Sequence, residues 1–399
     1  MLKKVLIAVL LCPLLLACEE EEDSFSFPRS ASQLNTNLDQ AAVLFPDRAQ
    51  FQRLNAGDTR ACFYRSDVFL GSESAQELDC WGERLLGDYV GAINRGDSKV
   101  MALGAGHVCT TRNDFGGIGI GCDGANEFGQ AETPESKTLQ YQEDNDPSKW
   151  TNHWTFNAEM VAAGAEHSCL LDSYGVHCWG HNNEGQIDAP YMEGPVWIAA
   201  GGNTSCAIDQ NQSLHCWGAL GADQVPESLT QVSNVDVGHD FVCAVQNGDV
   251  ICWGNTENWD EQPPDYVNVQ HISAGYDHVC VLDETAVGQP LAYDCFGNDH
   301  AEESILNLPA GVLQNMAVLG SEIETIVAGK GFTCASMKYD GYTYRNESQH
   351  TAVECWGANE FGQSRAPRFL CLGFHTTASI DDLGAESDTG RASCPQYSL

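Results

Sequence analysis

The sequence predicts an all-β fold, a seven-bladed β-propeller with one hairpin disulfide in each blade. Three observations lead to it: a pair of cysteines recurs seven times, glycines stand at fixed places before and after each pair, and turn-forming residues separate the two cysteines. No clear amphipathic helical pattern lies between the units. A propeller repeats small antiparallel sheets around an axis, which keeps the sheet edges short.

Each repeat unit is marked by two cysteines. The first cysteines of the units are Cys62, Cys109, Cys169, Cys206, Cys243, Cys280 and Cys334. The second cysteines are Cys80, Cys122, Cys178, Cys216, Cys252, Cys295 and Cys355. A glycine stands five residues before each first cysteine and two residues after each second one, and the first cysteines from Cys169 to Cys280 are spaced by 37 residues. This regularity indicates a structural repeat.

The turn chemistry pairs the two cysteines within a unit. In the stretch CAVQNGDVIC, Asn247-Gly248 is a strong hairpin signal. Cys243 and Cys252 then lie opposite each other, and opposed Cβ atoms are about 4.5 to 5.5 Å apart. A disulfide needs about 3.5 to 4.5 Å, so we expect a non-hydrogen-bonded site with slight local closure. Each bridge is expected to contribute about 2 to 3 kcal/mol.

The N-terminus predicts export. Lys3 and Lys4 precede a short apolar run over 5–16, which is the layout of a signal peptide and is too short to span a bilayer. The run ends in Leu-Leu-Ala-Cys at Cys18, which resembles the lipobox of bacterial lipoproteins. That resemblance implies that Cys18 is acylated, palmitate included, and becomes the first residue of the mature chain. An ordinary cleaved signal with a chance cysteine is the alternative.

Export favours disulfides, which persist outside the cytoplasm. Of the 18 cysteines, Cys12 leaves with the signal and Cys18 takes lipid, so an even number is left for bridges. We expect Cys371 and Cys394 to bridge each other. Metal binding is the competing interpretation, but the common spacing differs from the C-x2-4-C of structural zinc sites. No metal or cofactor is therefore predicted.

Composition and charge define the domains and the partners. We expect a lipoprotein signal peptide over 1–17, an acidic flexible tether over 18–46, the propeller over 47–365 and a C-terminal extension over 366–399. The net charge of -37 argues against nucleic acid, whose phosphates require lysine and arginine. The same charge suits a basic partner or a salty medium.

The stretch AGAEHSCLLDSYGVHCWGHNNEGQ (163–186) resembles the regulator-of-chromosome-condensation repeat, in the cysteine-bearing version of exported bacterial proteins. CWGANEFGQ (355–363) resembles it equally well, and the likeness covers about 55–365. It implies a seven-bladed propeller with a protein-binding face. Members of this family include a nucleotide-exchange factor, a β-lactamase inhibitor and light sensors. We do not carry the exchange activity over, because it belongs to a nuclear setting.

Three repeated features are interpreted as structural. His107, His167 and His278 stand two residues before a first cysteine, but other units hold phenylalanine or threonine there, which favours packing or capping over catalysis. The repeated tryptophans are expected to pack blade against blade rather than to stack on a ligand: Trp81, Trp179, Trp217, Trp253 and Trp356. The Asn-to-Gln tails, such as 182–186, are expected to form turns rather than calcium sites.

The hairpin lengths indicate where a partner binds. The distance between paired cysteines is greatest in units 6, 7, 1 and 2, which are contiguous in a closed ring. We expect one elevated arc of loops there, and its aromatic candidates are Phe69, Phe115, Tyr339, Tyr342 and Tyr344. A second candidate is the insertion over 133–157, which holds Trp150 and Trp154. Loop drift without function is the alternative.

Together these observations predict a non-enzymatic scaffold, tethered to a membrane of the bacterial cell envelope on its periplasmic side or at the cell surface. It would recognise a protein partner through loops on one propeller face. Two alternatives stay open. One is an exported enzyme or glycan-binding propeller, with carboxylates or aromatics at the channel mouth. The other is a propeller that inhibits an enzyme.

Overall fold

The computed structural model describes the chain from residue 54 to 366, with gaps. The described residues are 54–70, 73–83, 100–114, 117–133, 141–142, 150–151, 158–172, 175–257, 259–266, 268–284, 292–299, 304–310, 312–313, 322–343, 346–364 and 366. The predicted signal peptide, Cys18, the tether and the Cys371–Cys394 bridge lie outside them. Within the described residues, no helix is both long and apolar enough to cross a membrane.

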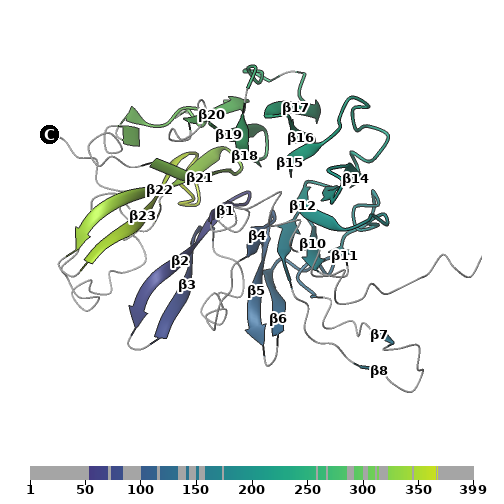
Figure 1. Ribbon diagram of the computed structural model, residues 1–399, viewed down its shortest axis with the longest axis horizontal. Helices are drawn as coiled ribbons and strands as arrows, with labels where there is room; N and C mark the ends of the chain where they lie inside the picture. The colour runs from purple at the N-terminus through teal and green to yellow at the C-terminus, as the bar shows by residue number, and fades with distance from the viewer. Residues whose placement is uncertain are drawn as a thin grey trace, which may run out of the picture.

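Seven three-stranded antiparallel sheets surround a central axis, and each is built from three consecutive strands (Figure 1). In chain order the blades are β1–β3 (Leu54–Ala56, Arg60–Leu70, Glu73–Gly82), β4–β6 (Met101–Leu103, His107–Asp114, Gly117–Gly124), β9–β11 (Met160–Ala163, His167–Asp172, Gly175–Gly180), β12–β14 (Pro195–Gly201, Thr204–Asp209, Leu214–Gly218), β15–β17 (Val232–Val237, Phe241–Gln246, Asp249–Gly254), β18–β20 (Val269–Ala274, His278–Asp283, Ala292–Gly297) and β21–β23 (Glu322–Ala328, Phe332–Thr343, Asn346–Gly357). The predicted all-β, seven-bladed propeller is confirmed. The insertion between blades 2 and 3 adds a small two-stranded sheet of β7 (Tyr141–Gln142) and β8 (Trp150–Thr151).

A ring of glycines surrounds the axis at the ends of the inner strands. A Cβ atom on Gly57 would lie 2.6 Å from the carbonyl oxygen of Gly104, and one on Gly104 would lie 2.4 Å from that of Gly164. At the other end of the chain, a Cβ on Gly329 would lie 2.8 Å from the oxygen of Gly57. Blade 7 therefore closes against blade 1 by close backbone approach, and among the described strands none is shared between these two blades. This approach explains the glycine five residues before each first cysteine.

The glycine two residues after each second cysteine has a different cause. All seven of these glycines have a backbone φ between 97° and 117°, a region that other residues rarely adopt. They are Gly82, Gly124, Gly180, Gly218, Gly254, Gly297 and Gly357. Each one ends the outer strand of its blade, so the repeated glycine marks the point where the chain leaves the sheet.

Each of the seven blades carries its predicted disulfide between the middle and outer strands. In blade 5, Gln246 pairs with Asp249 across the Asn247-Gly248 turn, and Cys243 lies opposite Cys252 three pairs further along. Because hydrogen-bonded and non-hydrogen-bonded pairs alternate from the turn, the cysteines occupy a non-hydrogen-bonded site. Their Cα atoms are 4.1 Å apart, and the other six bridges have separations of 4.0 to 4.1 Å. The predicted pairing and its slight closure are confirmed.

The hydrophobic core lies between neighbouring sheets. One cluster joins blades 3, 4 and 5 and includes Leu171, Ile208, Val235 and Trp253, all of them buried. A fully buried aliphatic side chain contributes about 1.5 to 3 kcal/mol relative to an exposed one. The inter-sheet contacts are therefore the main source of stability, and each blade depends on its neighbours.

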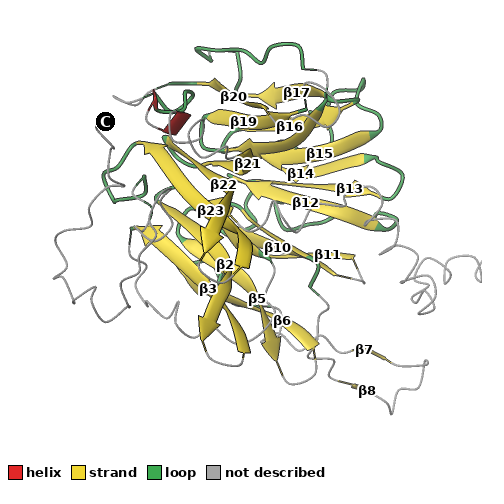
Figure 2. Cartoon of the chain, turned by 60° about the vertical axis from the view of Figure 1, so that its left-hand side comes forward, coloured by secondary structure: helices red, strands yellow, loops and turns green. Residues whose placement is uncertain are grey.

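Three adjacent blades carry hairpins that extend beyond the rest. Strands β22 and β23 have 12 residues each, β2 and β3 have 11 and 10, and β5 and β6 have 8, whereas the middle strands of blades 3 to 6 have 6. Figures 1 and 2 both show the three long hairpins side by side, projecting from the same part of the ring. In blade 6 the described strands pair as far as Asp283 and Ala292, and residues 285–291 of the connection between them lie outside the described residues.

Candidate functional site: the blade junctions and the channel mouth

The repeated histidine joins one blade to the next. At the junction of blades 3 and 4, Nε2 of His167 lies 2.8 Å from Oγ of Ser205, whose hydroxyl donates to the carbonyl oxygen of Gln186. Nε1 of Trp217 donates to the same oxygen at 2.9 Å. Since the serine proton is directed at the carbonyl, the imidazole must be the donor to Ser205. One carbonyl thus fixes a hydroxyl, an indole and, through the hydroxyl, an imidazole.

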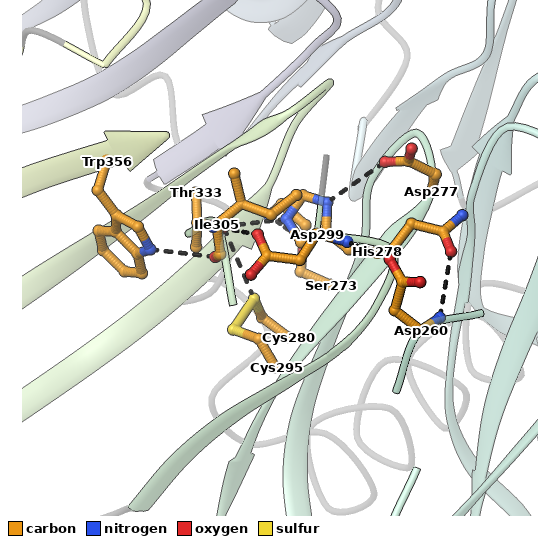
Figure 3. A network of polar contacts seen from close by, with 12 residues as sticks. Asp260, Ser273, Asp277, His278, Cys280, Cys295, Asp299, Ile305, Thr333 and Trp356 are labelled. Atoms are coloured by element: carbon orange, nitrogen blue, oxygen red, sulfur yellow. Dashed lines mark hydrogen bonds and ion pairs between the residues drawn. A yellow bond between two sulfur atoms is a disulfide. The ribbon is translucent and has the colours of Figure 1, made fainter. Parts of the chain in front are cut away.

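The same arrangement recurs at two other junctions. At junction 2/3 it consists of His107, Ser168, the carbonyl of Gln130 and Trp179. At junction 6/7, shown in Figure 3, it consists of His278, Thr333, the carbonyl of Ile305 and Trp356. The expectation that these histidines and tryptophans pack the blades together is confirmed by these contacts.

Burial keeps two of these imidazoles neutral. Desolvation lowers the pKa of His107 to about 4 and, together with the neighbouring imidazoles of His107 and His181, lowers that of His167 to about 3. The rings lie directly over the glycine three residues earlier: a Cβ on Gly164 would lie 2.2 Å from Cε1 of His167. The histidine and this glycine are therefore one packing unit.

The Asn-to-Gln tails form the predicted turns. Oδ1 of Asn182 accepts from the backbone N–H of Ile187 at 3.1 Å, and Oε1 of Gln186 accepts from that of Glu184 at 2.9 Å. Asn126 and Gln130 repeat both contacts in the preceding unit. The side-chain oxygens are thus used within the turn, whose last residue also supplies the junction carbonyl.

Junction 4/5 has the same backbone but lacks this network. Thr204 stands in place of the histidine and Val242 in place of the serine. Gln224 has the repeat position of Gln186, but the side chain that lies against Gly254 at this junction is that of Leu220. Nε1 of Trp253 is buried there without a hydrogen-bond acceptor, and its side chain is only 8 % exposed. Thr204 instead accepts from the backbone N–H of Leu220 within the same unit.

A pocket lies beside this incomplete junction, on the face where the inner strands end. Its volume is about 300 Å³, and we call it the junction pocket. Its lining residues are Ala165, Glu166, Gly202, Asn203, Thr204, Ala219, Leu220, His239 and Asp240. Small side chains on blades 3 and 4 leave the space open, because Ala165 and Gly202 stand at the position directly after the ring glycine.

The same position is filled on the other side of the channel mouth. The ring of Tyr276 stacks on His239 with centroids 4.1 Å apart, and Nζ of Lys330 lies 4.3 Å from the centre of the tyrosine ring. Lys330 also approaches Asp58 at 3.9 Å. Burial raises the pKa of Asp58, while Lys330 and His239 oppose the rise. Blades 5, 6, 7 and 1 therefore form a continuous arc of contacts around the mouth.

Polar side chains in the channel wall connect neighbouring inner strands. Oδ2 of Asp236 accepts from the backbone N–H of Ala274 at 2.8 Å, and desolvation raises the pKa of Asp236 to about 7. Asn55 accepts from Leu103 and Ser273 accepts from Ala328 in the same way. Sequence reasoning missed these residues, although all three stand seven positions before a first cysteine, and that shared phase was the available signal.

The structure places some of the predicted partner-binding residues and leaves others outside its described range. Phe69 pairs with Ser74 in the β2–β3 hairpin, and Tyr339 and Tyr342 lie on β22 opposite His350 and Glu347. Trp150 lies on β8, in the separate insertion sheet. Phe115, Tyr344 and Trp154 lie outside the described residues. The backbone thus brings Phe69 to a blade adjacent to that of the two tyrosines, and it keeps Trp150 apart from them.

These features define the class of the protein: a closed seven-bladed β-propeller with a disulfide in each blade. Residues 161–186, the third unit, match the profile of the regulator of chromosome condensation (RCC1) repeat. The chain therefore contains a repeat of the RCC1 family, as its resemblance to that family predicts. Seven disulfides are typical of a protein from an oxidising compartment.

Solved structures of three other proteins are similar to this chain. The CRINKLY WD40 ectodomain of the receptor kinase ACR4 from Arabidopsis thaliana is 21% identical, with a TM-score of 0.44, covering 66% of this chain and 83% of the other. The CR4 ectodomain from Physcomitrella patens is 20% identical, with a TM-score of 0.48 and coverages of 77% and 73%. Yeast RCC1 (Prp20), in complex with Kap60, is 14% identical, with a TM-score of 0.45 and coverages of 80% and 85%. Among curated protein sequences, no relative matches.

Proposed function

We propose that this protein is a non-enzymatic binding scaffold, tethered to a membrane of the bacterial cell envelope and engaging a protein partner through the loops of blades 7, 1 and 2. The observation that carries the proposal is the group of three adjacent long hairpins, which project together from an otherwise regular ring (Figure 2). The disulfides and the glycine ring hold their bases rigid. Loops on a rigid scaffold are where propellers place binding residues.

The charge of the chain selects the kind of partner. A net charge of -37 attracts basic proteins over a distance and raises their association rate at low salt. We therefore propose a partner with a positively charged surface.

Shortening one hairpin tests the binding face. Replacing Tyr339–His350 with a four-residue turn keeps the pairing of Lys338 with Thr351 and the ion pair of Lys338 with Glu324. Crosslinking on intact cells followed by mass spectrometry would identify captured partners. We expect capture to be lost in this variant and kept when residues 134–157 of the insertion are replaced by a short linker. The reverse result would move the binding site to the insertion.

The tether is tested separately. We propose that Cys18 carries the lipid, so the change Cys18→Ser should move the protein from the membrane fraction to the soluble fraction. Intact-mass measurement of the wild type should show the added acyl chains. A wild-type protein without added mass, or a variant that stays with the membrane, would contradict the tether.

The absence of catalysis is part of the proposal. It is supported by the place of the repeated histidines, which are buried between blades and engaged in packing contacts. A screen for hydrolase activity, together with glycan-array binding, tests the alternatives of an exported enzyme and a glycan-binding propeller. Turnover or specific glycan binding in either assay would replace the scaffold proposal.

A further inference from the structure

Three small residues on blades 3 and 4 leave space for the junction pocket. Ala165 and Gly202 are small at the position where Tyr276 fills the opposite side of the mouth. Thr204 is shorter than the histidine found at junctions 2/3 and 3/4. The volume of the junction pocket, about 300 Å³, lies at the lower end of the range for ligand pockets, about 300 to 1,000 Å³.

The walls of the pocket carry negative charge on rigid backbone. Glu166 and Asp240 stand at the same place in successive odd-numbered blades, two residues after the ring glycine. The backbone carbonyl oxygen of Glu166 accepts from the backbone N–H of His181 at 2.9 Å, and that of Asp240 from the backbone N–H of Asn255 at 2.9 Å, which fixes the backbone at both positions. Asp240 is 62% exposed, and Glu166 is 42% exposed beside His181. The residues that line the pocket include no lysine or arginine.

A second feature of the same junction is a donor without an acceptor. At junction 4/5 a Cβ on Gly254 would meet Cδ1 of Leu220 at 3.0 Å. At junction 3/4 a Cβ on the equivalent Gly218 would meet Cβ of Gln186 at 3.1 Å, so Leu220 lies where Gln186 lies one junction earlier. By this equivalence the indole N–H of Trp253 faces the segment of Leu220, a residue that lines the pocket.

Each carboxylate has an imidazole beside it, since Nδ1 of His181 lies 2.9 Å from Glu166 and Nε2 of His239 lies 3.8 Å from Asp240. The junction thus offers two part-exposed carboxylates, no lysine or arginine in the pocket lining, and a buried N–H that lacks an acceptor. A peptide residue with a basic side chain carries a cation for the carboxylates and a backbone carbonyl oxygen for the N–H.

We propose that the junction pocket receives one arginine or lysine side chain of the protein partner, with Glu166 and Asp240 contacting the cation. This inference rests on the proposed function, since it names the partner chemistry that one part of the scaffold recognises. It adds a site at the channel mouth, separate from the long hairpins. Because the backbone of both residues is held in place, only their side chains have to be ordered when the basic side chain enters.

The test uses the indole signals of the full, disulfide-bonded chain labelled with ¹⁵N. Acetyl-arginine N-methylamide is titrated into the protein, and acetyl-citrulline N-methylamide serves as the neutral isostere. The Trp253 signal is assigned with the Trp253→Phe variant. We expect a saturable shift of that signal with the arginine compound at millimolar concentration, and binding of the citrulline compound that is at least about tenfold weaker, because charge-assisted hydrogen bonds are lost.

Two variants and a matched control complete the test. Asp240→Asn should weaken binding of the arginine compound about tenfold, because the exposed carboxylate is lost without any change in the core. Asp277→Asn, at the same place one blade further on and outside the pocket, should leave binding unchanged. Ala165→Tyr should abolish the shift by filling the pocket, as Tyr276 does opposite.

The results separate this inference from the proposed function. No saturable shift, equal binding of citrulline, or an equal effect of Asp240→Asn and Asp277→Asn would overturn the inference. If Ala165→Tyr still captures its partner on cells while the Tyr339–His350 replacement does not, the scaffold proposal stands and the pocket is not part of it. If neither the wild type nor any variant captures a protein, the proposed function fails independently of the peptide titration.

Discussion

Junctions 3/4 and 4/5 are adjacent and their strands pair in the same register, yet the side-chain hydrogen bonds described above differ between them. At junction 3/4 one carbonyl oxygen accepts hydrogen bonds from a serine and a tryptophan, and the serine in turn contacts a histidine. At junction 4/5 threonine and valine replace the histidine and the serine, and the side chain of Leu220 lies against Gly254. An indole N–H is left there without an acceptor, and a pocket lies alongside.

The difference shows what holds the ring together. The disulfides, the glycine approach and the apolar packing are the same at both junctions, so these features suffice for the fold. The polar network is an addition that some junctions carry and others do not. Junction 5/6 gives a third solution, in which Trp259 packs edge-on against Phe241 with centroids 4.8 Å apart.

Acid is expected to act on the complete junction first. The unfolded chain binds a proton on His167 below about pH 6.5, whereas the native state does so only below about 3, so the free energy of unfolding falls as pH drops through this window. The pKa values of His107 and His271 are lowered to about 4, so these residues also make the free energy of unfolding fall as pH drops from about 6.5 to 4. Asp236 opposes them, because its raised pKa gives stability that is lost as pH rises from about 4 to 7.

The variant His167→Phe isolates the contribution of junction 3/4. Phenylalanine stands at the equivalent position in blades 5 and 7, so the fold accepts it. The slope of unfolding free energy against pH should fall by one proton, about 1.4 kcal/mol per pH unit, and urea denaturation between pH 4 and 7 measures it. Thr204→Ser at junction 4/5 should leave the slope unchanged. Equal slopes in wild type and His167→Phe would show that the imidazole is not buried as described.

The glycine beneath the histidine should be almost as sensitive. A Cβ on Gly164 would meet the His167 ring at 2.2 Å, so Gly164→Ala should destabilise the protein by about 3 kcal/mol through overpacking. Gly175 has a φ of 136° but nothing within 4 Å of a Cβ, so Gly175→Ala should cost only about 1 kcal/mol from backbone strain. Thermal unfolding of both variants measures the difference, and equal losses would mean that the packing argument is wrong.

Removing the central hydroxyl should have a smaller effect. Ser205→Ala leaves the N–H of His167 buried without an acceptor, which costs about 1 to 2 kcal/mol. The half-buried hydroxyl of Ser233 donates to the carbonyl of Val245 at 3.3 Å and provides the control, with an expected loss below about 0.5 kcal/mol for Ser233→Ala. Denaturant midpoints compare the two, and a larger loss at Ser233 would contradict the network.

The smallest expected effect is the difference in stability between variants of two tryptophans. Trp217→Phe loses a hydrogen bond to Gln186, whereas Trp253→Phe loses none, and the two substitutions remove the same volume. Trp217→Phe should therefore cost about 1 kcal/mol more. If Trp253→Phe proves the more costly change, then its N–H has a partner, and the pocket beside it is closed in solution.

Much of this fold was predictable from the sequence, because its repeat is marked by residues with narrow geometric roles. Asn247-Gly248 fixed the register that opposes Cys243 and Cys252. The junction pocket was not predictable, because it follows from small residues in two neighbouring blades and is closed by residues of a third, which only the ring brings together. The same holds for the channel wall, where Asp236 reaches the backbone of the next blade. The loop of blade 6 stays a prediction, because cysteine spacing counts residues and does not distinguish strand from loop.

The pairing of the cysteines has a consequence for biogenesis. Each of the seven bridges joins two cysteines that follow one another along the chain, with none of the other twelve between them. If the chain is oxidised from its N-terminus as it emerges, the next of these cysteines to appear after the first cysteine of a blade is its native partner. Oxidation of these fourteen cysteines in their order of appearance would therefore yield the native bonds without reshuffling.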